Sequence, residues 1–176
     1  MATRAPKTYV KIRAEVEKVL AESAVNKAPV DVEVVAKSLG AEVRYSPFDG
    51  ELAGMLVRGA DEHPIIGVNS LHHPNRQRFT VAHECGHLIL HKGEVHVDRR
   101  LQVNRRDEIS SLAIDPDEIE ANRFAAELLM PYKLLVADLQ GRQIDVENDD
   151  LIKELAIKYG VSVQSMTLRI TNLFNL

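Results

Sequence analysis

The chain has 176 residues, 45% of them hydrophobic, which is enough to bury the core of one compact domain. Its 22 basic and 26 acidic side chains give a net charge of −4, so the molecule as a whole has no electrostatic reason to coat nucleic acid. No apolar run approaches the roughly 20 residues that cross a bilayer, residues 1–28 lack a signal-peptide core, and the single cysteine excludes an internal disulfide. We therefore expect a cytoplasmic protein without a membrane partner.

The first part of the chain predicts two helices followed by a small sheet. Residues 9–22 place apolar side chains at helical spacing among charges, which is typical of a helix with one buried face. Residues 30–39 form a second, shorter helical pattern, and Gly40 stands where helices often end. Three short β-rich runs follow, which we expect to form a small antiparallel sheet. They are residues 41–45, 52–58 and 64–68.

The middle of the chain carries its most informative motif, HECGH at residues 83–87. The apolar pattern around this motif predicts a buried helix of roughly 15 residues. Positions four apart on a helix differ by roughly 40° around its axis, so His83 and His87 project side by side and can bind one ion. Glu84 projects next to them, where it can take a proton from a water molecule that the metal activates. The motif therefore predicts the zinc site of a hydrolase.

A catalytic zinc site also needs a third protein ligand and an open position for water. Residues 115–130 predict the next helix, which could bring a carboxylate opposite the histidines. Within it, Glu120 shares a face with Phe124 and is our expected third ligand, with Glu127 as the alternative. His91 lies four residues beyond His87, and we expect it to be a partner of the ligands and not a ligand itself.

The residues around the motif are expected to play smaller parts. Residues 92–111 are polar, basic and weakly periodic, so we expect a long surface connection with little regular structure. A peptidase needs an oxyanion donor, for which Tyr132, His91 and His96 are candidates. Cys85 points away from the two motif histidines on the helix, so we expect it to pack in the core and not to act as a nucleophile.

The last part of the chain predicts a pair of helices that is similar to a helix-turn-helix. The pair covers residues 150–159 and 162–174, with Gly160 in the turn and Ser162 capping the second helix. Direct DNA binding is one hypothesis. The second helix offers few polar groups, however, and acidic residues precede the pair, which favours helices that pack on the protein or hold a protein substrate.

Five stretches of the sequence match a known pattern. They are GMLVR at residues 54–58, IGVN at 66–69, QRFTVAHECGHLILH at 77–91, EANRFAAELLMP at 120–131 and LAIKYGVS at 155–162. With these stretches, which extend over most of the chain after residue 50, the sequence resembles the ImmA/IrrE family of zinc metallopeptidases. The combination is highly specific, whereas HExxH alone occurs in many unrelated metalloproteases.

The resemblance implies roles for individual residues. His83 and His87 would bind Zn²⁺, and Glu84 would be the catalytic acid and base. Glu120, at the start of the Glu-Ala-Asn motif, would be the third zinc ligand. The activity implied is that of a site-specific endopeptidase that cleaves and inactivates a helix-turn-helix repressor, typically one that controls a mobile element, a prophage or a stress response.

We therefore expect an α+β, zincin-like fold in which a small antiparallel sheet packs on helices. Residues 1–140 would form the metallopeptidase domain, and residues 141–176 a helix-turn-helix-like extension. The substrate would add as a strand along residues 54–58, at the edge of the sheet.

Two other functions remain open at this point. One is a non-catalytic regulator that contains zinc and binds DNA or a partner, and the other is a toxin-like component of a toxin–antitoxin pair. Glu84 argues against the first, because a structural zinc site normally closes all four positions with protein groups and needs no glutamate beside them.

Overall fold

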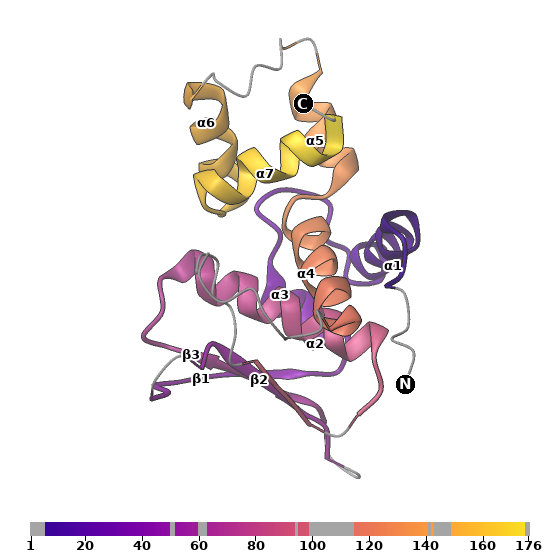
Figure 1. Cartoon of the computed structure of the whole chain (residues 1–176), viewed down its shortest axis with the longest axis vertical. Coiled ribbons are helices and arrows are strands. Elements are labelled where there is room, and N and C mark those ends of the chain that lie inside the picture. The colour runs from indigo at the N-terminus through magenta and orange to yellow at the C-terminus, as the bar shows by residue number, and fades with distance from the viewer. Residues whose placement is uncertain are drawn as a thin grey trace.

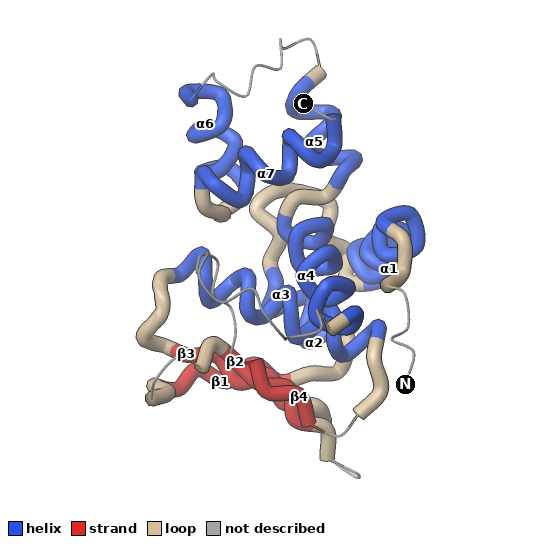
Figure 2. The backbone as a smooth tube through the Cα atoms, in the orientation of Figure 1, coloured by secondary structure: helices blue, strands red, loops and turns tan. Residues whose placement is uncertain are grey.

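The computed structural model describes residues 6–49, 52–59, 63–93, 95–98, 115–140, 142 and 149–174. These residues form seven helices and a four-stranded sheet, which confirms the predicted α+β class. Figure 1 shows the sheet at one end of the molecule, two crossed helices in the middle and the C-terminal helices at the other end. Figure 2 shows the same segregation of strands from helices.

The sheet has the strand order β1-β3-β2-β4. Its strands are β1 (Glu42–Ser46), β2 (Gly54–Val57), β3 (Ile65–Asn69) and β4 (Val95–Asp98). β1 runs parallel to β3, whereas β2 is antiparallel to both β3 and β4. The sheet is therefore mixed and not wholly antiparallel, because a local β pattern indicates a strand but does not determine its partner.

Two expectations about the sheet are corrected. Residues 95–98 form β4, although they lie in the segment expected to have little regular structure; four residues are too few for a period to show in the sequence. Residues 99–111 of that segment lie outside the described residues. β2 is paired on both sides, so a substrate cannot add along residues 54–58, and the edges of the described sheet are β1 and β4.

Six of the seven described helices lie where the sequence predicts them, whereas the helix over residues 132–139 is not predicted. The seven helices are α1 (Tyr9–Glu22), α2 (Val32–Ser38), α3 (Pro74–Leu90), α4 (Pro116–Leu129), α5 (Tyr132–Leu139), α6 (Asp149–Tyr159) and α7 (Val163–Phe174). Asp115 caps α4 by accepting a hydrogen bond from the backbone N–H of Asp117, at 2.9 Å. Ser162 caps α7 in the same way through the N–H of Ser165, at 3.1 Å. No helix in the described part of the chain has the length and apolarity that a membrane span requires.

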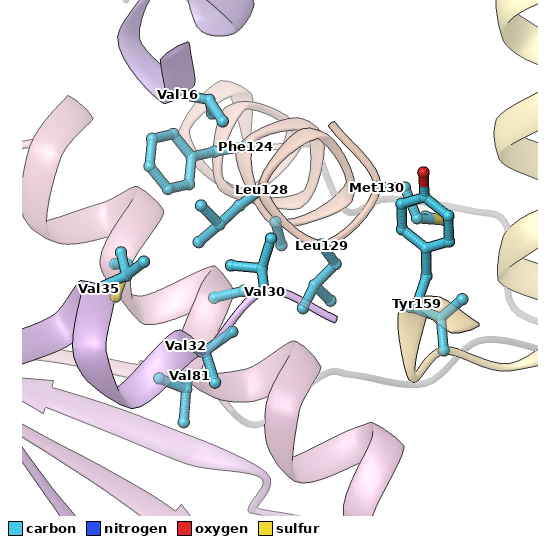
Figure 3. Packing of buried hydrophobic residues seen from close by; sticks show 14 of the residues in the cluster. Val16, Val30, Val32, Val35, Val81, Phe124, Leu128, Leu129, Met130 and Tyr159 are labelled. Atoms are coloured by element: carbon cyan, nitrogen blue, oxygen red, sulfur yellow. The ribbon is translucent and has the colours of Figure 1, made fainter. Parts of the chain in front are cut away.

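The crossing of α3 and α4 positions the rest of the molecule. A Cβ atom on Gly86 of α3 would lie 3.1 Å from the Cα atom of Ala121 on α4, so only glycine lets the two helices approach this closely. Around the crossing, Phe124 and Leu128 pack with apolar side chains from α1, α2 and α3, as Figure 3 shows. The polar residues that α3 presents near the crossing are therefore held against α4 by a rigid core.

The C-terminal pair is fastened to this core by two arginines. Arg78 of α3 donates hydrogen bonds to the carbonyl oxygens of Val30, at 3.0 Å, and Gly160, at 3.2 Å. Arg169 of α7 is buried and pairs with the carboxylate of Glu127, while it also donates to the carbonyl of Met130. The turn between α6 and α7 and the body of α7 are thus both tied to the α3–α4 unit.

Candidate metal centre

The histidine motif occupies the most buried part of α3. Every residue from 80 to 87 is buried, and His83 and Glu84 have no exposed surface. Ionisable side chains in such a place need hydrogen-bond, ionic or metal partners to offset the loss of water. This stretch of α3 faces α4, which supplies the polar groups described next.

Two imidazoles and one carboxylate converge between α3 and α4. The Nε2 atoms of His83 and His87 lie 3.0 Å apart. Glu118 of α4 places one carboxylate oxygen 3.5 Å from His83 Nε2 and the other 3.4 Å from His87 Nε2. Ligand atoms at zinc distances of about 2.0–2.1 Å in a tetrahedral site would be about 3.3 Å apart. Both the donor types and their spacing therefore fit a zinc ion held by these three side chains.

The outer nitrogens of both imidazoles have partners that can accept a proton from Nδ1. Asn122, one turn after Glu118 on α4, has its Oδ1 atom 3.1 Å from His83 Nδ1. His91 has its Nδ1 atom 3.0 Å from His87 Nδ1. When each motif histidine donates its Nδ1–H to these acceptors, its Nε2 lone pair points toward the other histidine and Glu118. The two rings are thus prepared to bind one ion through Nε2.

Glu84 lies beside the cluster on the side of the sheet. A Cβ atom placed on Gly54 of β2 would be 3.5 Å from Glu84 Oε1 and only 2.3 Å from a methyl carbon of Thr80. Arg58, just after β2, donates to the carbonyl oxygen of His87, at 2.6 Å, and so holds the C-terminal end of α3. Burial lowers the pKa of Arg58, and the charge of Glu84 opposes that shift. The general-base candidate therefore lies between the metal cluster and β2.

Glu120, the third ligand expected from the sequence, is not brought to the two motif histidines. Its Oε2 atom lies 3.2 Å from His91 Nε2 and 2.9 Å from the ammonium of Lys7. The backbone N–H of Lys7 donates to its other oxygen, at 2.6 Å. With Asp117, whose carboxylate is 3.5 Å from the same His91 nitrogen, these groups form a second cluster beside the first.

Glu127, the alternative, lies at the far end of α4. It pairs with Arg169 and accepts a hydrogen bond from the backbone N–H of Tyr132, at 3.0 Å. Tyr132, a candidate oxyanion donor, packs its ring on the guanidinium of Arg13, whose Cζ lies 3.9 Å from the ring centroid. The side chain of His96, another candidate donor, lies outside the described residues.

Glu118 and Asn122 are the residues that the sequence argument missed. Glu120 shares a face of α4 with Phe124, and this face is buried as predicted, but it does not point toward His83 and His87. Residues two apart on a helix differ by about 200° around its axis, so their side chains project to nearly opposite sides. Glu118 and Glu120 therefore cannot face the same group. The signal in the sequence was the four-residue spacing of Glu118 and Asn122, which places a carboxylate and an amide on one face.

Cys85 packs in the core as predicted. It is fully buried. Burial, together with the neighbouring charge of Glu84, raises the pKa of its thiol to about 12. A thiol with these properties is not a nucleophile at neutral pH.

A helix bearing HExxH, opposed by a carboxylate from a second helix and flanked by a small sheet, is the arrangement of a metallopeptidase. The family comparison agrees. The chain belongs to the Peptidase M78 family, because the model of that family, described as the IrrE N-terminal-like domain, matches residues 36–171. Peptidases of this family depend on a metal, and in the described part of the chain two His/carboxylate clusters have the donors and spacing to hold one.

A solved structure with a similar fold is a Mycobacterium tuberculosis transcriptional regulator. The two share 15% sequence identity with a TM-score of 0.57, over 92% of this chain and 47% of that chain. The chain thus spans about half the length of that structure, and at this identity the likeness concerns the fold alone. No curated protein matches the chain.

Proposed function

We propose that this protein is a zinc-dependent endopeptidase whose metal ligands are His83, His87 and Glu118. The observation that carries the proposal is the convergence of two Nε2 atoms and one carboxylate within 4.8 Å. Two histidines and a glutamate form a known set of catalytic zinc ligands, which leaves a fourth position open. Glu118 replaces Glu120 as third ligand because its carboxylate lies within 3.5 Å of both histidines, whereas the carboxylate of Glu120 pairs with His91 and Lys7.

Glu84 is the proposed catalytic acid and base. A bound zinc ion would supply the positive charge that activates water and polarises a peptide carbonyl. Glu84 would accept the proton of the attacking water and pass it to the leaving amine, as its buried position next to the two histidines allows. Asn122 and His91 would hold the imidazoles in the required tautomers.

The substrate would bind as an extended segment along β4. The residue of β4 that pairs with Gly54 is Asp98, and Gly54 lies beside Glu84, so the outer edge of β4 passes next to the cluster. A peptide that pairs with this edge would bring its backbone carbonyls to the metal centre.

A cleft of about 960 Å³ is lined by residues of α3, α4 and the C-terminal pair. Phe79 and Asn122 line it at the end near His83, and Leu168 of α7 lines it at the other end. Gln164 and Ser165, two of the polar groups that would contact DNA in a helix-turn-helix, also face this cleft. The pair is therefore suited to hold a protein substrate.

We propose a helix-turn-helix repressor as that substrate, in the cytoplasm, and cleavage as the switch that relieves repression. Direct DNA binding by this chain has less support, because Arg169, the cation of the second helix, is buried against Glu127. We retain residues 1–140 as the peptidase domain and residues 141–176 as the substrate-holding extension.

The experiment is zinc analysis and cleavage by the Glu84→Gln variant. The variant is co-expressed with a helix-turn-helix repressor encoded in its gene neighbourhood, next to wild type and to Glu15→Gln, a control that changes an exposed glutamate of α1. We expect Glu84→Gln to keep its zinc and lose cleavage, and Glu15→Gln to behave as wild type. Normal cleavage by a zinc-loaded Glu84→Gln variant would overturn the catalytic assignment. Zinc binding without cleavage in the wild type, for any repressor tested, would favour a non-catalytic regulator.

A further inference from the structure

A chain of hydrogen bonds leads away from the proposed metal centre through the second cluster. It runs from His87 to His91, then to Glu120, and ends at Lys7 near the N-terminus. We propose that Glu120 and Lys7 are positioning residues, which orient His91 and through it the zinc ligand His87. This inference rests on the proposed metal site, but not on the proposed peptidase activity.

The direction of each hydrogen bond follows from the one before it. If His87 binds zinc through Nε2, its proton is on Nδ1 and is donated to His91 Nδ1, 3.0 Å away. His91 must then carry its own proton on Nε2, which it donates to Glu120 Oε2, 3.2 Å away. The arrangement therefore requires an acceptor at position 120, and a carboxylate is the strongest acceptor available there.

Glu120 is held rigidly enough to act in this way. Its side chain has no exposed surface, and the backbone N–H of Lys7 donates to one oxygen while the ammonium of Lys7 pairs with the other. The same ammonium donates to the carbonyl of Leu90, at 3.0 Å, and Arg123 donates to the carbonyl of Lys7, also at 3.0 Å. Lys7 thus connects the N-terminal segment by hydrogen bonds to both α3 and α4, the helices that bear the metal centre.

The second cluster is not itself a second metal site. The ammonium of Lys7 lies 2.9 Å from Glu120 Oε2, where it already neutralises the carboxylate and would repel a metal cation. The third member, Asp117, has 46% of its side chain exposed. A buried carboxylate with a fixed cation on one side and an imidazole on the other is suited to orient that imidazole.

Because Glu120 and Lys7 carry opposite charges, substitutions at these two residues distinguish a positioning role from a purely electrostatic effect on zinc binding. Removing the negative charge of Glu120 should weaken zinc binding under both explanations. Removing the positive charge of Lys7 should strengthen zinc binding if only charge matters, but weaken it if Lys7 holds Glu120 in place. Lys7→Met is therefore the informative variant, and Asp117→Asn is the matched control, since it removes a carboxylate near the same His91 nitrogen without breaking the chain.

The measurement is zinc affinity of the full chain, without substrate, by competition with a chromophoric chelator. Loss of an outer partner typically costs about 10- to 100-fold in metal affinity. We expect a loss in that range for His91→Phe, about tenfold for Glu120→Gln, several-fold for Lys7→Met, and little change for Asp117→Asn. His91→Asn, whose amide oxygen can replace the Nδ1 acceptor, should recover part of the loss. The visible spectrum of bound Co²⁺ should change with Glu120→Gln and not with Asp117→Asn.

Two results would overturn the inference. One is unchanged or tighter zinc binding by Lys7→Met together with equal effects of Glu120→Gln and Asp117→Asn. The other needs no variant: nitrogen-15 spectra of the zinc-loaded wild type that show His91 protonated on Nδ1. Wild type that binds zinc without cleaving any repressor would remove the proposed peptidase activity and leave this inference standing.

Discussion

The two His/carboxylate clusters between α3 and α4 combine the same two types of donor, imidazole and carboxylate, in different numbers and different settings. The first joins His83, His87 and Glu118, and the second joins His91, Asp117 and Glu120, with all ligand atoms of each within 4.8 Å of one another. They differ in what meets the carboxylate. In the second cluster the ammonium of Lys7 already lies against Glu120.

Solvent access also differs between the two clusters. Glu118 has 34% of its side chain exposed, whereas Glu120 has none. A catalytic metal must be reached by water and substrate, and a supporting residue works best when packing fixes it. Donor type and spacing alone therefore do not identify a metal site. The nearby cations and the solvent exposure of the donors distinguish one candidate cluster from the other.

The largest effect on zinc affinity should come from replacing the carboxylates of Glu118 and Glu120 by amides, one at a time. Glu118→Gln removes a metal ligand, so zinc affinity should fall by more than the about 100-fold upper range for an outer partner, and cleavage should be lost. Glu120→Gln should cost about tenfold, by the same measure. Chelator competition on both variants tests the comparison. A greater loss for Glu120→Gln would restore Glu120 as the third ligand.

A smaller effect on zinc affinity is expected at Asn122, the hydrogen-bond partner of the proposed ligand His83. Asn122→Ala removes the acceptor of the His83 Nδ1–H, 3.1 Å away, and should weaken zinc binding about 10- to 100-fold. Asn122→Asp keeps an acceptor and should bind zinc more nearly as the wild type does. If Asn122→Ala binds zinc normally, the orientation of His83 does not depend on Asn122, and His87 alone would be held by an outer partner.

The helix crossing that supports both clusters can be tested with Gly86→Ala. The added Cβ would lie 3.1 Å from the Cα atom of Ala121, and such overpacking costs about 1–3 kcal/mol, of which the better helix propensity of alanine offsets about 1 kcal/mol. The net cost of about 0–2 kcal/mol should lower Tm by up to about 8 °C, measured by circular dichroism on the metal-free chain. A higher Tm would mean that α3 and α4 can move apart freely.

The parts of the site that could be predicted from the sequence are those set by a single helix. His83, Glu84 and His87 lie within one turn, so their convergence follows from helical geometry alone. Glu118 could not be chosen over Glu120, because the face of α4 that looks toward α3 depends on how the helices cross at Gly86. The metal roles of all these residues stay predictions until zinc is measured.

The same limit applies to the fold. Six of the described helices are predicted because their apolar residues recur at helical spacing, and β1 to β3 are predicted because β-branched residues cluster within each short run. The parallel pairing of β1 with β3 and the existence of β4 depend on contacts between distant segments. These contacts leave no pattern in a run of four or five residues.

The smallest effect is expected in the alkylation of Cys85. This measurement tests whether the other substitutions leave the packing of the core unchanged. Its thiol is fully buried and its pKa is raised to about 12, so at pH 8 only about one molecule in 10⁴ carries the thiolate that alkylating reagents attack. We expect essentially no iodoacetamide labelling of the folded wild type over hours, and full labelling in denaturant, as measured by mass spectrometry. Glu118→Gln and Glu120→Gln should resist labelling equally, because each changes a polar group at the helix interface without opening the core. Faster labelling of Glu118→Gln alone would mean that its loss of zinc reflects separation of α3 from α4 and not the loss of a metal ligand.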